Sequence, residues 1–158
     1  MKKGSIGIVK AGVIAGIYVV LTFVAAALGL SSGTIQVRFS EALCVLPVFM
    51  PQAVPGLFVG CILANTLTGA LPMDILFGSL ATLIGALGTR LLRKNRILAL
   101  LPPILSNTII IPFVLKFTYG IPGSVWYFML TVGLGEVISC GVLGWLLGRE
   151  FDKKINLI

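Results

Sequence analysis

The chain has 158 residues, of which 58% are hydrophobic and only 11% are charged, and its mean hydropathy is +1.10. Soluble domains carry about 25% charged residues, so this composition excludes an ordinary soluble fold and indicates a membrane protein. The formal net charge of +7 does not indicate a nucleic-acid partner, because the basic residues are grouped beside apolar stretches, as in the cytoplasmic segments of membrane proteins.

Apolar stretches bounded by proline, glycine and charged residues predict six helical spans, at residues 8–30, 41–50, 56–71, 74–92, 97–117 and 124–147. A spanning helix needs about 20 apolar residues, so the second stretch crosses only if residues 38–40 contribute to it; otherwise it is partly embedded. The loop at 31–40 contains alternating Ile35, Val37 and Phe39, a pattern that suits a segment lying over a cavity. Three prolines within the fifth stretch predict a kinked helix.

The positions of the basic residues predict the orientation of the chain. They form three clusters: Lys2, Lys3 and Lys10; Arg90, Arg93, Lys94 and Arg96; and Arg149, Lys153 and Lys154. If all three clusters are cytoplasmic, each must be preceded by an even number of spans, a condition that six spans satisfy. We therefore expect an all-α integral membrane protein with six transmembrane helices, a single domain over residues 1–158 and both termini in the cytoplasm.

The residues that most catalytic mechanisms need are scarce. The sequence contains no histidine, which excludes Ser-His-Asp and Cys-His catalysis. With no histidine and no Cys-x-x-Cys pair, it also lacks the motifs of the common zinc sites. Cys44, Cys61 and Cys140 have no paired spacing and lie in apolar runs, so we interpret them as packing residues. No G-x-x-x-x-G-K-[ST] motif occurs, so uphill transport requires an energised partner or an ion gradient. We expect no enzyme activity and no cofactor.

Polar residues inside the spans are candidates for a binding site, because burying them in hydrocarbon is costly. Glu136 lies about 12 residues into the sixth span, roughly 18 Å along a helix that rises 1.5 Å per residue. It shares a helix face with Gly133 and Cys140, whose small side chains leave room for a ligand. Asn65 and Asn107 lie near mid-depth and offer both donors and acceptors. The alternative for all three polar residues is a hydrogen bond to another helix.

Further charged groups lie at the ends of spans. Arg38 and Glu41 are three residues apart, so they either form a surface ion pair or present a guanidinium and a carboxylate to a ligand. Asp74 follows Pro72 and fits a helix N-cap first and a ligand contact second.

The first span contains two overlapping pairs of small residues at a spacing of four. Ala11 pairs with Ala15, and Gly12 pairs with Gly16. Such pairs let another helix approach closely. They indicate either packing within the bundle or docking of a partner helix near the cytoplasmic end.

Five segments carry a resemblance to a known family: residues 36–43 (QVRFSEAL), 55–61 (PGLFVGC), 74–83 (DILFGSLATL), 101–107 (LPPILSN) and 135–136 (GE). Together they resemble the QueT family, the substrate-binding S components of energy-coupling factor (ECF) transporters. The resemblance implies a six-helix S-component fold in a bacterial plasma membrane and uptake of queuosine precursors, which are 7-deazaguanine bases. It also implies that Ala11 and Ala15 match the A-x-x-x-A motif that contacts a transmembrane coupling subunit, which two partner ATPases drive.

The expected ligand can be matched to the polar residues. A 7-deazaguanine presents a ring N–H beside an amino group, an edge that one carboxylate can bind through two charge-assisted hydrogen bonds. Either Glu41 or Glu136 fits that role, and a second carboxylate suits the cation of an aminomethyl-bearing precursor. Aromatic stacking is expected near the outer face, from Phe39, Tyr119, Trp126 or Tyr127. The candidate substrate-binding residues are Glu136, Glu41, Asn107, Asn65, Arg38, Asp74, Phe39 and Trp126.

Two alternative functions follow from the same residues. The chain could be an S component for another vitamin-like ligand, such as biotin, riboflavin or thiamin. It could also be a non-transporting membrane scaffold, in which Glu136, Asn65 and Asn107 only tie helices together.

Overall fold

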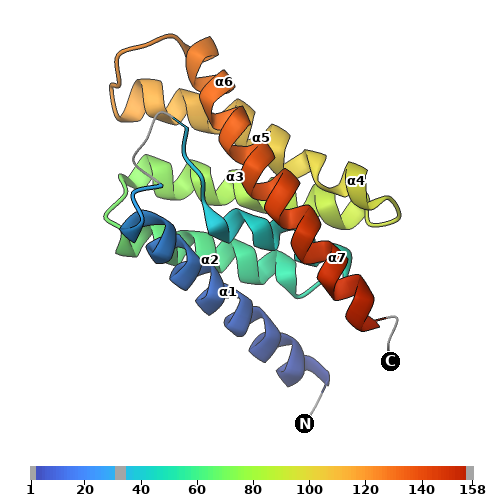
Figure 1. The fold of residues 1–158 in the computed structure, drawn as a ribbon. Helices are drawn as coiled ribbons and strands as arrows, with labels where there is room; N and C mark the ends of the chain where they lie inside the picture. The colour runs from blue at the N-terminus through green and yellow to red at the C-terminus, as the bar shows by residue number, and fades with distance from the viewer. Residues whose placement is uncertain (1–2, 31–34, 156–158) are drawn as a thin grey trace.

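The computed structural model describes residues 3–30 and 35–155, and every regular element within them is a helix (Figure 1). In chain order the elements are α1 (Lys3–Ala27), the 3₁₀ helix η1 (Phe39–Val48), α2 (Ala53–Leu67), α3 (Pro72–Leu91), α4 (Arg96–Ala99), α5 (Leu101–Phe113), the π-helical turn η2 (Val114–Thr118), α6 (Val125–Glu136), the π-helical segment η3 (Val137–Leu143) and α7 (Gly144–Ile155). The expected fifth span corresponds to α4, α5 and η2, and the sixth to α6, η3 and α7. Lys2 and residues 31–34 of the expected first loop lie outside the described residues.

Four of the helical stretches are long and apolar enough to cross a membrane: Gly4–Ala27, Pro72–Leu91, Arg96–Thr118 and Val125–Lys154. The other two, η1 and α2, contain 10 and 15 residues, fewer than the roughly 20 that a straight crossing needs. The all-α membrane bundle expected from the sequence is confirmed. The sequence pattern placed the end of the third span too late, because α2 ends at Leu67 rather than near residue 71.

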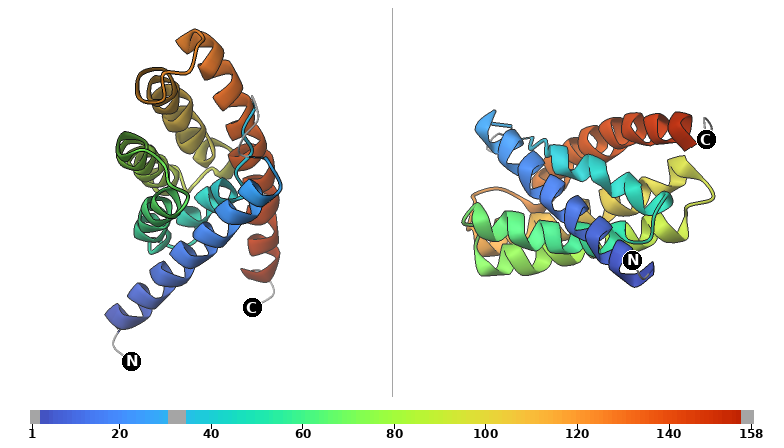
Figure 2. Two further views of the ribbon diagram at one scale, coloured as in Figure 1. Left: turned by 90° about the vertical axis from the view of Figure 1, so that its left-hand side faces the viewer. Right: turned by 90° about the horizontal axis from the view of Figure 1, so that it is seen from below.

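The short helix η1 lies inside the bundle, where it packs against α1, α3, η3 and α7 (Figures 1 and 2). Most of its side chains are buried, including Glu41 and Cys44. Its last carbonyl groups find a donor in α3, because Nη1 of Arg90 donates to the oxygen of Pro47 at 3.1 Å and to that of Val48 at 3.2 Å. A cation is favourable at this end of a helix, where carbonyl groups are otherwise unpaired.

Helices α1 and α2 approach each other at two glycines of α2. A Cβ atom added to Gly60 would lie 2.8 Å from Cβ of Tyr18 and 3.0 Å from Cα of Ala15, and one added to Gly56 would lie 2.8 Å from the oxygen of Ala11. The alanine pair of the first span therefore faces α2 inside the bundle. By contrast, a Cβ atom at Gly12 or Gly16 would meet no atom within 4 Å.

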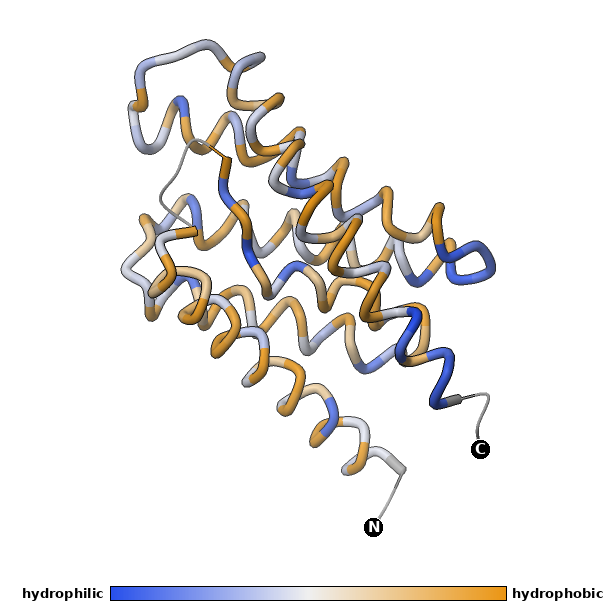
Figure 3. The backbone as a smooth tube through the Cα atoms, in the orientation of Figure 1, coloured by the Kyte–Doolittle hydropathy of each residue, from blue (hydrophilic) through white to orange (hydrophobic). Residues whose placement is uncertain are grey.

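The described residues of the three basic clusters lie toward one end of the molecule. Both termini and the α3–α4 turn lie toward the right and bottom of Figure 1, whereas the α2–α3 turn and the α5–α6 loop lie toward the left and top. Hydrophilic stretches mark the α3–α4 turn and the end of α7 in Figure 3. This arrangement is the one that an even number of crossings before each basic cluster requires.

The α1–α2 contact gives a first prediction. Replacing Gly60 with valine forces α1 away from α2, and overpacking of this kind costs about 1–3 kcal/mol. We expect Gly60→Val to lower the thermal unfolding midpoint of the detergent-solubilised protein. The same substitution at Gly16, where a side chain meets open space, should leave the midpoint nearly unchanged. Equal midpoints for the two variants would contradict this packing.

Candidate ligand-binding site

A polar cavity of about 370 Å³ lies at the end of the bundle opposite the termini, a volume within the range of roughly 300–1,000 Å³ found for ligand sites. It is lined by the loop after α1, the end of α2, the start of α3 and the chain from η2 onward, through Gln36, Arg38, Asn65, Thr68, Gly69, Ala70, Asp74, Leu115, Tyr119 and Ile121. Two smaller cavities, of about 250 and 20 Å³, also contain Gln36 in their walls. The three spaces therefore adjoin around Gln36.

The segment that carries Gln36 and Arg38 is held against the last span. The N–H of Arg38 donates to Oγ of Ser139 at 3.1 Å, and the N–H of Val37 donates to the oxygen of Leu30 at 3.0 Å. Gly135 allows this approach, because a Cβ atom there would collide with the carbonyl oxygen of Gln36. The sequence pattern that suited a segment over a cavity is thus realised, and Gln36 is a lining residue that the sequence analysis missed.

Asn65 and Asp74 meet at the α2–α3 turn. A Cβ atom added to Gly78 would lie 3.1 Å from Nδ2 of Asn65 and 3.4 Å from Oδ1 of Asp74, so this glycine leaves room for both. Asp74 is not the N-cap that its position after Pro72 predicted, because Leu71 occupies that position and Asp74 lies in the first turn. It instead accepts a hydrogen bond of 2.7 Å from the Tyr119 hydroxyl.

Tyr119 closes this side of the cavity. The N–H of Leu71 donates to its hydroxyl oxygen at 3.3 Å, which ties the chain after η2 to the α2–α3 turn. Burial, together with the hydrogen bond to Asp74, raises the pKa of Tyr119 above its usual value. The phenol therefore stays neutral at physiological pH and remains a donor.

Glu136 and Asn107 reach the inner part of the same system. They line the 20 Å³ cavity together with Arg38. Glu136 is the last residue of α6 and is 9% exposed, at the point where the helix widens into the π-helical segment η3. Such π segments within α-helices occur frequently at functional sites. The fold thus brings together Arg38, Asn107 and Glu136, which are distant in the sequence.

Glu41 lies behind the cavities rather than in their walls. It is 2% exposed. Its Oε1 accepts from the Tyr18 hydroxyl at 2.5 Å, and its Oε2 accepts from Sγ of Cys44 at 3.2 Å. Tyr18 was not singled out in the sequence, although a lone hydroxyl inside an apolar span implies a buried hydrogen-bond partner.

Arg38 is positioned among three carboxylates. It interacts electrostatically with Glu41 and Asp74, and Glu136 interacts with it in turn. Within the described part of the chain its guanidinium forms no ion pair and no side-chain hydrogen bond. The surface ion pair with Glu41 that their spacing allowed is therefore not formed, and the donors of Arg38 remain available to a ligand.

The two aromatic residues of the candidate set lie elsewhere. Trp126 is 79% exposed on α6, and Phe39 begins η1. Neither lines a cavity described here. Tyr119 lines the largest polar space and Tyr127 the neighbouring one, so these are the aromatic side chains next to the polar groups.

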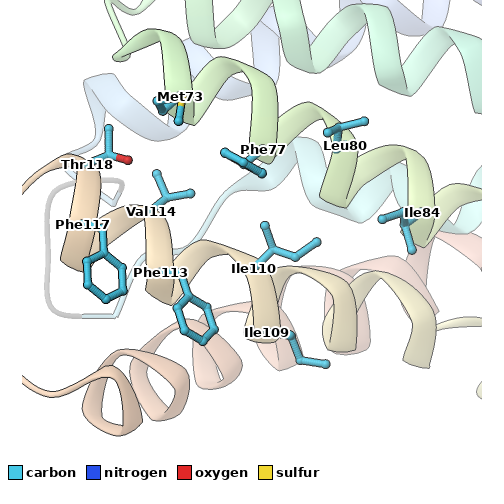
Figure 4. A pocket seen from close by; sticks show the side chains of 10 residues that line it. All are labelled: Met73, Phe77, Leu80, Ile84, Ile109, Ile110, Phe113, Val114, Phe117 and Thr118. Carbon is cyan, nitrogen blue, oxygen red and sulfur yellow. The ribbon is translucent and has the colours of Figure 1, made fainter.

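A larger groove, of about 520 Å³, runs between α3 and the α5–η2 segment (Figure 4). Its walls are aliphatic and aromatic, and Thr118 is the only lining residue with a side-chain hydrogen-bonding group. Both walls belong to candidate membrane spans. This groove lacks the polar groups that would orient a nitrogenous base, so the polar cavity is the better candidate site.

These features define an all-helical membrane bundle with a polar, charge-lined cavity at one end, a candidate site for a small polar solute. The family model described as QueT transporter matches residues 8–153, nearly the whole chain. The chain therefore belongs to the QueT transporter family. Comparison with curated proteins and with solved structures gives no match.

The hydrogen bond between Tyr18 and Glu41 gives a second prediction. In Tyr18→Phe the ring is kept but a buried carboxylate oxygen loses its donor, a loss that costs about 1–3 kcal/mol or more. We expect a lower thermal unfolding midpoint. Tyr127→Phe is the matched control, because Tyr127 is 48% exposed, and it should behave like the parent protein. An unchanged midpoint for Tyr18→Phe would show that this bond contributes little.

Proposed function

We propose that this chain is the substrate-binding S component of an ECF-type importer in a bacterial plasma membrane, and that it binds a 7-deazaguanine precursor of queuosine from the outer side. The observation that carries the proposal is the convergence of Arg38, Asn65, Asp74, Asn107 and Glu136 on adjoining cavities at the end opposite the basic clusters. Family membership supports a transporter, and a transporter needs no catalytic residues.

The cavity groups match the chemistry of such a base. The Glu136 carboxylate can accept the ring N–H and the adjacent amino group together. The amides of Asn65 and Asn107 supply both donors and acceptors, and Arg38 can donate to the ring carbonyl. Tyr119 and Tyr127 offer ring faces next to the polar space.

The charges favour a cationic precursor. The carboxyl groups of Glu41, Asp74 and Glu136 all interact electrostatically with the single guanidinium of Arg38. An aminomethyl cation on the base would offset the excess negative charge, and Asp74 at the outer cavity is the proposed partner for it. Glu41, already paired with Tyr18 and Cys44, is proposed to support the site from behind rather than to contact the ligand.

The third prediction tests the site. Glu136→Gln should weaken binding of 7-deazaguanine, measured by calorimetry on purified protein, by about tenfold, which corresponds to roughly 1.4 kcal/mol. Glu41→Gln should have a smaller effect, and Glu150→Gln at the exposed end of α7 should have none. Unaltered affinity in Glu136→Gln would overturn the proposed site.

The same measurement separates the alternative functions. The panel compares 7-deazaguanine, its 7-aminomethyl derivative, biotin, riboflavin and thiamin. Tighter binding of the 7-aminomethyl derivative than of the uncharged base would support the charge argument. Preference for a vitamin would replace the ligand and keep the S-component function. Binding of none of them, with no co-purifying ATPase, would favour the scaffold.

Energy for uptake is proposed to come from a coupling transmembrane subunit and two ATPases, docked on α1. Ala15 is almost fully buried against Gly60 of α2, so the exposed side of the small-residue pairs is Gly12 and Gly16. The N-terminal part of α1 projects from the bundle in Figure 2, with Ile8 76% exposed. This surface allows the close helix approach that small residues permit.

The fourth prediction separates docking from folding. Gly12→Leu combined with Gly16→Leu should abolish co-purification of the coupling subunit and leave base binding intact, because both positions face open space. Ala11→Leu combined with Ala15→Leu should reduce stability as well, since these residues pack on α2. A retained complex in the glycine double variant would contradict docking on this face.

A further inference from the structure

Behind the cavity, three buried donor atoms from two separate elements converge. They are Sγ of Cys44 and a carboxylate oxygen of Glu41, both in η1, and Sγ of Cys140 in η3, all within 4.8 Å of one another. Sγ of Cys44 contacts Oε2 of Glu41 at 3.2 Å, and Sγ of Cys140 contacts the Glu41 carbonyl oxygen at 3.4 Å. A fourth group adjoins them, because Oε2 of Glu136 accepts from Sγ of Cys140 at 3.2 Å.

These separations suit a small tetrahedral cation. A Zn²⁺ ion with bonds of about 2.3 Å to sulfur and about 2.1 Å to oxygen holds two sulfur ligands about 3.8 Å apart, and a sulfur and an oxygen about 3.6 Å apart. In the structure Sγ of Cys44 and Oε2 of Glu41 are 3.2 Å apart, and all three donor atoms lie within 4.8 Å of one another, so small side-chain movements would bring them to those separations. Two sulfurs with oxygen ligands are also a donor set that favours zinc-like cations over Mg²⁺ or Ca²⁺.

The charges of such a site balance. Two thiolates and the Glu41 carboxylate carry a charge of −3 and the ion +2, and the remaining negative charge lies within the electrostatic reach of Arg38. Binding replaces the two thiol protons, which are released to solvent. The cluster adjoins the smallest cavity, because Glu136 contacts Cys140 and also lines that cavity.

Cys61 shows what a cysteine outside the cluster does. It is equally buried, but its sulfur accepts from Nδ2 of Asn65 at 3.6 Å and from Oγ1 of Thr82 at 3.4 Å. It does not belong to the group of converging donors. The chain therefore supplies its own matched control for a thiol that only packs.

We propose that Glu41, Cys44 and Cys140 form a binding site for a zinc-like divalent cation. Bound metal would join η1 to η3, two elements that the hydrogen bond between Cys140 and Glu41 already links. The site is distinct from the proposed base-binding cavity, since none of its three ligands lines that cavity.

The fifth prediction tests this site with Cd²⁺ as the probe, on reduced protein in detergent. The parent protein and Cys61→Ser should each bind one Cd²⁺ per chain and show a thiolate-to-metal charge-transfer band in the ultraviolet. Cys44→Ser and Cys140→Ser should each weaken Cd²⁺ binding at least tenfold and reduce the band. No band in the reduced parent protein, or an equal loss in Cys61→Ser, would overturn the proposal.

Two further measurements keep folding and base binding separate from metal binding. Glu41→Gln retains both thiols, so it should keep the charge-transfer band while binding Cd²⁺ more weakly. An unchanged Cd²⁺ affinity in that variant would remove Glu41 from the ligand set. Cys44→Ser should still bind 7-deazaguanine, which would demonstrate a folded protein and show that metal binding can be lost while base binding is kept.

Discussion

The buried carboxylate of Glu41 sets the constraint on which the rest of the fold depends. An ionisable group inside an apolar bundle must find its partners within the protein, and those of Glu41 come from separate elements. Tyr18 of α1 donates to one of its oxygens, Cys44 of η1 lies against the other, and Cys140 of η3 contacts its backbone carbonyl. The hydrogen bonds that Glu41 requires therefore link the first helix, the short central helix and the last span.

Small residues make that arrangement sterically feasible. Gly60 lets α1 approach α2 closely enough to place Tyr18 in the core, and Gly135 lets the segment before η1 lie directly on α6. The same segment carries Arg38 into the cavity, held by the bond from its N–H to Ser139. At both contacts, the absence of a side chain on the glycine allows two elements that are far apart in the sequence to pack closely.

The sequence alone was enough to predict those features that depend on the composition of a single helix. Hydropathy located the helices, and the cost of burying polar groups identified Glu136, Asn107 and Asn65. It could not separate Glu136, which lines a cavity, from Glu41, which lies behind one, because that difference depends on how η1 packs. Nor could it tell that Arg90 binds the end of η1 in addition to marking a basic cluster, or that Ala15 faces inward. These are properties of pairs of helices, and periodicity within one helix does not determine them.

Helix α1 takes part in both the proposed binding of a ligand and the proposed docking of a coupling subunit. Its N-terminal part projects from the bundle with Gly12 and Gly16 exposed (Figure 2), while Tyr18, further along, bonds to the carboxylate behind the cavity. The segment that follows α1 supplies two lining residues of that cavity, Gln36 and Arg38. The helix that carries the proposed docking surface therefore also donates the hydrogen bond that holds Glu41 behind the proposed binding cavity, so the two proposed functions share one structural element.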